Sequence, residues 1–134
     1  MIKFFYASVL LALMAACGNN TETEREMNLQ EEVMAIHDSI MPMTDSVTRL
    51  KQRLKNREVE ISKGDSAMVK KAIEKLNSAN EAMMQWMRQY DQPSDTLEQS
   101  KKKTYLKEQK EKIKRVKEKM LKSIEKANII LKDQ

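Results

Sequence analysis

Hydrophobic positions after residue 27 recur in the rhythm of long amphipathic helices. Over residues 27–61 the apolar side chains are separated alternately by four and three residues, at Leu29, Val33, Ile36, Ile40, Met43, Val47, Leu50 and Leu54. Eight apolar residues in this rhythm form one continuous stripe along a helix. Because the stripe stays in phase beyond Pro42, we expect this proline to kink the helix without ending it.

Two further segments predict helices, over residues 66–91 and 95–132. The apolar stripe of the second is expected at Val69, Ile73, Leu76, Asn80, Met83, Met87 and Tyr90. That of the third is expected at Leu106, Ile113, Val116, Met120, Ile124, Ala127 and Leu131, interrupted by Gln109 and shifted by one position near Ser123. Gly64 is expected to end the first helix in a left-handed cap, and Asp95 with Glu98 to form a capping box.

Short connections between three such helices predict an all-α fold, an antiparallel three-helix bundle. Lys, Glu, Gln, Met and Leu dominate the composition, which is typical of long helices. An extended coiled coil that dimerises is the alternative architecture.

The first 17 residues carry a different pattern, that of a secretory signal. A charge at Lys3 and an apolar run are followed by Ala15, Ala16 and Cys17, the one cysteine of the chain. This segment resembles the lipobox of bacterial lipoproteins, with Met14 where leucine is usual. The resemblance implies a signal peptide over residues 1–16 and a lipid-bearing Cys17 at the start of the mature chain. It also implies a bacterial envelope protein, which we expect on the periplasmic face of the outer membrane.

Residues 17–26 are polar and lack apolar spacing, so they are expected to be a tether before a helical domain over residues 27–134. Charge is uneven along the mature chain. Residues 17–62 hold six basic and nine acidic residues, whereas residues 95–134 hold thirteen and seven. A basic segment favours a polyanionic partner. For an exported lipoprotein we expect anionic lipid headgroups and no nucleic acid.

The residue inventory predicts no enzyme. The chain has one histidine, one cysteine that is expected to carry lipid, and no glycine-rich phosphate loop. Its carboxylates lie among lysines at helix-surface spacing, as Glu108 does before Lys112 and Glu118 before Lys122. These charges are expected to form a solvated face. No cofactor is expected, apart from the copper(I) considered next.

Methionines and the single histidine form the main chemical candidate. Met34, His37 and Met41 share one side of the first helix, and Met83, Met84 and Met87 surround Trp86 in the second. A turn centred near Gly64 would place Met41 level with Met87, Met43 with Trp86, and His37 with Tyr90 and Asp91. Thioethers and an imidazole are ligands that select Cu(I) or Ag(I). The same methionines could instead fill the core or form a groove for a partner helix.

Asn80 falls within an apolar stripe, where a buried amide would fix helix register or partner number. It could equally lie at the edge of the stripe and meet water. Trp86 and Asn80 are therefore candidate partner or register residues.

The motifs His-Asp-x-x-Met-Pro-Met (37–43) and Met-Met-x-Trp-Met (83–87) resemble small helical lipoproteins of the Bacteroidota, often labelled "viral A-type inclusion protein". This resemblance implies no catalytic residues. The leading hypothesis is a non-enzymatic, membrane-tethered scaffold or interaction module that presents its basic third helix and the Trp86 region. It would bind lipid through Cys17 and a further copy or another envelope protein. The alternative is a periplasmic Cu(I) or Ag(I) binding protein.

Overall fold

The computed structural model describes residues 20–60 and 63–132, and these form three α-helices. They are α1 (Asn20–Glu60), α2 (Lys63–Gln89) and α3 (Gln99–Lys132). No strand occurs in the described ranges, so the all-α prediction is confirmed. The predicted signal peptide and Cys17 lie outside the described residues.

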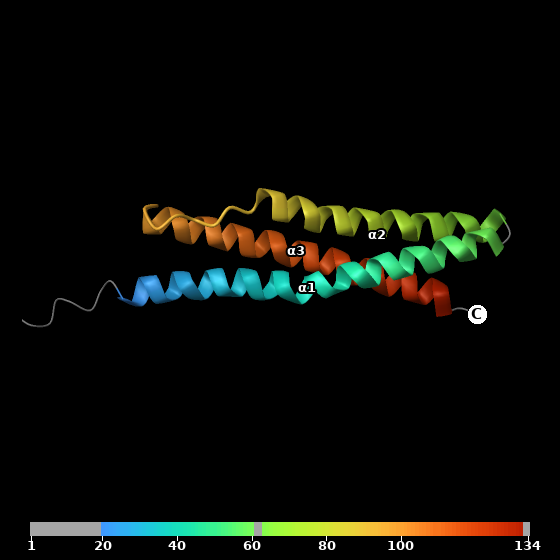
Figure 1. The fold of residues 1–134 in the computed structure, drawn as a ribbon, viewed down its shortest axis with the longest axis horizontal. Coiled ribbons are helices and arrows are strands. Elements are labelled where there is room, and N and C mark those ends of the chain that lie inside the picture. The colour runs from blue at the N-terminus through green and yellow to red at the C-terminus, as the bar shows by residue number, and fades with distance from the viewer. Residues whose placement is uncertain (1–19, 61–62, 133–134) are drawn as a thin grey trace, which may run out of the picture.

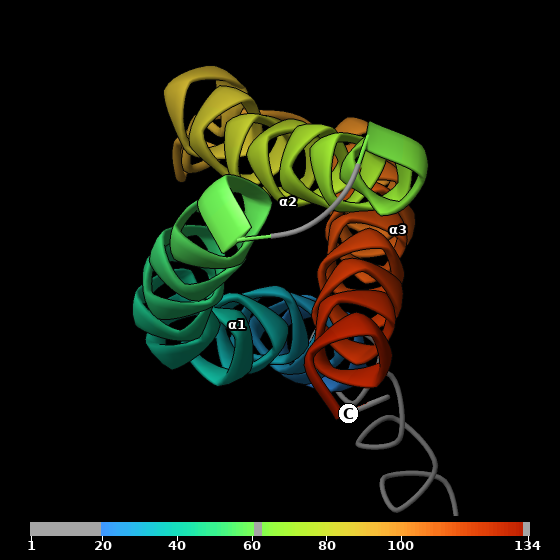
Figure 2. The same cartoon turned by 90° about the vertical axis from the view of Figure 1, so that its right-hand side faces the viewer.

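The helices pack as an antiparallel bundle. Figure 1 shows α1 and α3 running in the same direction and α2, which comes between them in the sequence, running in the opposite direction. Viewed along the bundle, the three helices occupy the corners of a triangle (Figure 2), and every pair of helices is in contact. The predicted three-helix bundle is therefore the observed architecture, and one shared core lies along its axis.

The core confirms the stripe predicted for α1. Val33, Ile40, Val47 and Leu54 are at most 1% exposed, and Leu50 is also buried. Ile36 and Met43 are partly buried against this core. Because the four-and-three spacing keeps each of these residues on the same side of the helix, α1 faces the other two helices along most of its described length.

In α2 the buried stripe differs from the predicted one. Its fully or nearly fully buried members are Val69, Ala72, Leu76, Ala79, Met83 and Trp86. The predicted Ile73, Met87 and Tyr90 are only partly buried beside them. Two of the six are alanines, which alternate with larger apolar residues and are as fully buried as they are.

In α3 two polar residues complete the buried stripe. Gln109 and Ser123 are each 4% exposed and lie between the predicted apolar members Leu106, Ile113, Met120 and Ala127. The Ser123 hydroxyl donates a hydrogen bond of 2.8 Å to the Met120 carbonyl, so its polar atom is satisfied within the helix. The interruptions seen in the sequence are thus core positions, and the stripe does not drift around them.

The ends of the first two helices differ from the prediction. α1 begins at Asn20, so most of the segment predicted as a tether is helical, because its glutamates and arginine are good helix formers and it contains no proline. α2 begins at Lys63, which places Gly64 in the first turn of a helix rather than in a cap.

α3 begins at Gln99, four residues later than predicted. The Leu97 N–H donates to the Ser94 carbonyl over 3.1 Å, which closes a turn where the capping box was expected. The Glu98 carbonyl then accepts from the N–H groups of Lys101 and Lys102, each at 3.0 Å. Glu98 is therefore the residue from which the helix starts.

α1 continues through Pro42, as the sequence predicted. Figure 1 shows its ribbon changing direction about midway along its length. Pro42 is also near the middle of the helix in sequence, since α1 runs from Asn20 to Glu60. A proline inside a helix removes one backbone hydrogen bond and bends the axis.

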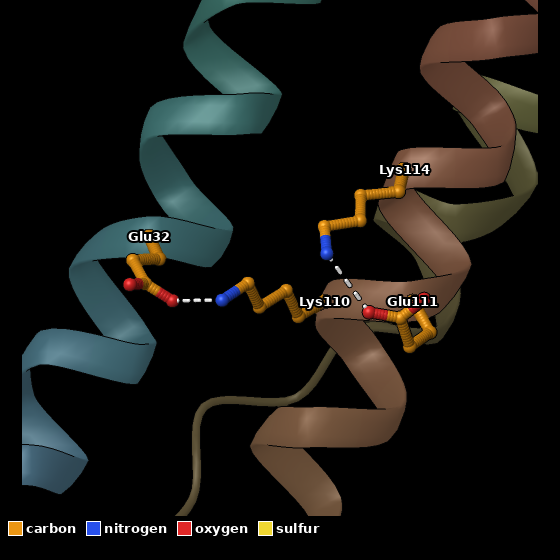
Figure 3. A network of polar contacts seen from close by, with 4 residues as sticks. All are labelled: Glu32, Lys110, Glu111 and Lys114. Atoms are coloured by element: carbon orange, nitrogen blue, oxygen red, sulfur yellow. Dashed lines mark hydrogen bonds and ion pairs between the residues drawn. The ribbon is translucent and has the colours of Figure 1, made fainter.

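Polar contacts also join α1 to α3. The Lys110 ammonium reaches across to the Glu32 carboxylate, while the neighbouring Glu111 pairs with Lys114 along α3 (Figure 3). About two helical turns beyond the Lys110–Glu32 pair, the Lys117 ammonium donates to the Ser39 hydroxyl over 3.0 Å. These contacts fix how α1 lies against α3. None of the helices, over the residues described, combines the length and apolar character needed to cross a bilayer.

Candidate functional site

Four ring side chains line up across the bundle and join all three helices. His37 of α1 lies beside Trp86 of α2, with ring centroids 5.7 Å apart. Trp86 stacks on Tyr90 at 4.8 Å, and Tyr90 on Tyr105 of α3 at 6.3 Å. We call His37, Trp86, Tyr90 and Tyr105 the aromatic row.

The register of α1 and α2 differs from the prediction by about one helical turn. The sequence placed the turn at Gly64, whereas α1 ends at Glu60 and α2 begins at Lys63. Moving the turn by about two residues displaces facing residues by about four, which is close to one turn of helix. His37 therefore lies beside Trp86 instead of Tyr90.

The predicted methionine and histidine ligands are distributed over different environments. Met83 is fully buried in the core, while Met84, the next residue on the same helix, is 39% exposed. Consecutive helical residues point about 100° apart, so these two cannot face one ion together. In α1, Met34 is half-buried and Met41 is 39% exposed.

The remaining candidates add no ligand cluster. The His37 side chain is 17% exposed, and its Nδ1 lies 2.9 Å from an Asp38 carboxylate oxygen. Met87 is partly buried against the core. Within the described ranges, no group of three or more His, Cys, Asp or Glu residues is placed to hold a metal ion. No observation gathers the six predicted ligands into one site.

The aromatic row contains satisfied and unsatisfied polar atoms. The Tyr105 hydroxyl accepts a hydrogen bond of 2.9 Å from the Asp91 N–H, which ties the loop over residues 90–98 to α3. Trp86 Nε1 and Tyr90 Oη are buried and have no hydrogen-bond partner among the described residues. Burial, and secondarily the neighbouring Tyr105, raises the pKa of Tyr90.

The two predicted partner residues are also located. Asn80 is half-buried, so it lies at the edge of the buried stripe rather than at its centre. Trp86 is only 6% exposed, and most of its surface is used in the core and in the aromatic row.

The cations of α3 differ in whether they pair with a carboxylate, and exposed Lys107, Lys126 and Lys132 are among those that form no ion pair in the described ranges. Several are paired: Lys110 with Glu32, Lys114 with Glu111, and Lys122 with Glu118. The last of these is one of the two helix-surface pairs that the sequence predicted. Lys112, Arg115 and Lys119 are exposed, and none of them forms an ion pair within 4 Å among the described residues; Arg115 acts on the Glu111 carboxylate only at longer range, and Glu111 pairs with Lys114.

These three cations line one side of a shallow groove of about 300 Å³ between α2 and α3. The apolar part of its lining is Ala82, Trp86 and Val116. Gln85 and Gln89 contribute amides from the α2 side. We call the groove formed by these eight residues the basic groove. Its chemistry suits an elongated partner that combines carboxylates with apolar side chains.

Comparison of the chain with protein-family models, with curated proteins and with solved structures gives no significant match in any of the three. The functional interpretation therefore comes from this chain's own residues.

Sequence reasoning missed Tyr105 and the three groove cations. A signal for the cations was present, because Lys112, Arg115 and Lys119 are spaced three and four residues apart and so share one face of a helix. No sequence signal separates them from the other lysines of α3, since pairing with carboxylates depends on how the helices pack.

Proposed function

We propose that this chain is a non-enzymatic scaffold or interaction module of the bacterial envelope, tethered through lipid on Cys17. The observation that carries the interaction role is the basic groove. Three exposed cations there form no ion pair among the described residues, and they lie next to an apolar lining that includes Trp86. Charges that the bundle does not pair internally are available to a partner.

The tether is supported by the sequence of the first 17 residues and by the resemblance to a lipobox. Two or more acyl chains hold a protein stably at a membrane, whereas one gives only marginal binding. The test is to express the full chain and Cys17→Ala in a bacterium fed with labelled palmitate. We expect label and membrane attachment in the parent and loss of both in the variant. Labelled Cys17→Ala would refute the tether.

The interaction role is tested in the envelope with a photo-reactive residue. Gln85 is exposed and lines the basic groove, whereas Glu125 is an exposed residue of α3 outside it. Placed at Gln85 of the full chain, the probe should give a discrete crosslinked product. Placed at Glu125, it should give none of that product. Equal crosslinking from both positions, or none from Gln85, would contradict the proposal.

A further inference from the structure

A second stripe on α1 carries carboxylates and methionines, which could complement the cations and the apolar lining of the basic groove. Glu31, Met34, Asp38, Met41 and Asp45 are separated by three, four, three and four residues, so they share one face of the helix. Carboxylates and methionines alternate along it. We call these five residues the acid–methionine stripe.

The stripe is open to solvent. Glu31, Asp38 and Asp45 are exposed, Met41 is 39% exposed and Met34 is half-buried. No lysine or arginine pairs with its three carboxylates among the described residues; Asp38 contacts only the neighbouring His37. The stripe therefore offers exposed carboxylates, two of which (Glu31 and Asp45) form no ion pair among the described residues, together with accessible apolar surface.

The charges of the two surfaces are complementary, and the spacing of two carboxylates in the stripe matches that of two groove cations. Residues 28–47 of α1 contain four acidic residues and no lysine or arginine, whereas residues 110–122 of α3 contain seven basic and two acidic residues. Asp38 and Asp45 are seven residues apart, as are Lys112 and Lys119. Each pair therefore spans about 10.5 Å along its helix.

From this complementarity we propose that the basic groove binds the acid–methionine stripe of a second copy of this chain. Resting on the proposed function, this inference names the partner of the groove. The carboxylates of the stripe approach Lys112, Arg115 and Lys119, while its methionines cover the apolar lining. Trp86, whose buried indole N–H lacks an acceptor among the described residues, is part of that lining.

A compact anion suits the groove less well than a helix does. Three cations spread over about two helical turns cannot all contact one phosphate-sized group, but they match carboxylates repeated along a helix. Because stripe and groove are different parts of the chain, the contact is heterologous, and copies join head to tail. Attachment to one membrane would raise the effective concentration of the copies.

The test reverses the charge of each surface in the full chain. The groove variant carries Lys112→Glu and Lys119→Glu, and the stripe variant carries Asp38→Lys and Asp45→Lys. Two differently tagged copies are expressed together with the photo-reactive residue at Gln85 of one. We expect the crosslink between tags to fall at least about tenfold when both copies are the groove variant or both the stripe variant, because attraction becomes repulsion.

Mixing the two variants provides the decisive comparison. The groove variant keeps its native acidic stripe, which can bind the native basic groove of the stripe variant. The acidic groove of the groove variant can likewise bind the basic stripe of the stripe variant. The crosslink should therefore return to near the parent level. The matched control, Lys107→Glu with Lys132→Glu, changes the charge by the same amount at exposed residues outside the groove and should leave it unchanged.

Two results would overturn the inference. One is crosslinking between tags that survives both homogeneous variants, and the other is a mixture that fails to recover. If Gln85 crosslinks to another envelope protein and never to the second tag, the proposed function holds and this inference is wrong. If Gln85 gives no product at all, both are wrong.

Discussion

Trp86 takes part in two environments through one side chain. It stacks on Tyr90 and lies tilted beside His37 in the aromatic row, and it also lines the basic groove. Its indole N–H and the Tyr90 hydroxyl are buried without partners among the described residues. A buried polar atom without a hydrogen bond lowers stability by about 1–3 kcal/mol. Substitutions that remove these polar atoms therefore measure how the aromatic row affects the free energy of unfolding.

Tyr90→Phe and Tyr105→Phe should have opposite effects at neutral pH. The first removes an unpartnered hydroxyl and should leave the free energy of unfolding unchanged or raise it by about 1 kcal/mol. The second removes the acceptor of the Asp91 N–H and should lower it by about 1 kcal/mol. Chemical denaturation of both variants beside the parent measures the difference. Equal losses in the two would show that the Tyr90 hydroxyl has a partner.

The same tyrosine predicts a dependence on alkaline pH. Burial raises the pKa of Tyr90 above its ordinary value of 10.0, so the unfolded chain releases this proton before the folded one does. The associated stability is fully present below pH 10.0 and is lost as pH rises through the folded pKa. Denaturation followed from pH 9 to 11 should show a shallower decline in Tyr90→Phe than in the parent. Identical slopes would contradict the assignment.

At the scale of elements, the sequence predicted the three helices, because their apolar spacing is regular and their charged faces are distinct. It did not predict which stripe of α2 is central, since Ala72 and Ala79 are weakly hydrophobic and were passed over for Ile73 and Asn80. Their burial reflects how closely the helices pack, which the periodicity of one helix does not contain.

The candidate site was less accessible to sequence reasoning for a related reason. The aromatic row depends on the register between helices, and a displacement of the turn by two residues was enough to exchange the neighbour of His37. The sequence singled out the motifs around His37 and Trp86 but left open whether they meet, and the structure brings these two side chains together. Tyr105 and the groove cations required the third helix to be placed as well.

Gln109 tests the packing of α3 as an element. This residue is 4% exposed and continues the buried stripe between Leu106 and Ile113. Gln109→Leu keeps a similar volume and replaces an amide by apolar surface, so we expect the free energy of unfolding to rise by about 1 kcal/mol. Glu108→Leu, at an exposed neighbouring position, should change it by less than about 0.5 kcal/mol. A destabilised Gln109→Leu would indicate a hydrogen bond that the amide needs.

For the whole molecule, one core is shared by all three helices. Buried residues of α1, α2 and α3 belong to a single cluster, and each pair of helices is in contact. Removing any one helix exposes apolar residues of the other two. The bundle should therefore unfold as one cooperative unit.

Truncation after Pro93 tests this cooperativity. The remaining chain keeps α1 and α2 but lacks Ile113, Val116 and Met120, which complete their core. We expect a broad thermal transition with reduced helicity, measured by circular dichroism, where the parent unfolds sharply. A sharp transition in the truncated chain would show that α1 and α2 fold independently of α3.

An odd number of antiparallel helices places the two ends of the bundle's chain far apart. Figure 1 shows the start of α1 and the end of α3 at opposite ends of the rod. At 1.5 Å per residue, the 34 residues of α3 extend over about 50 Å. If lipid on Cys17 fixes the first end, the bundle acts as a spacer. Anything joined beyond Lys132 would then stand off from the bilayer, whereas a two- or four-helix arrangement would return it to the surface.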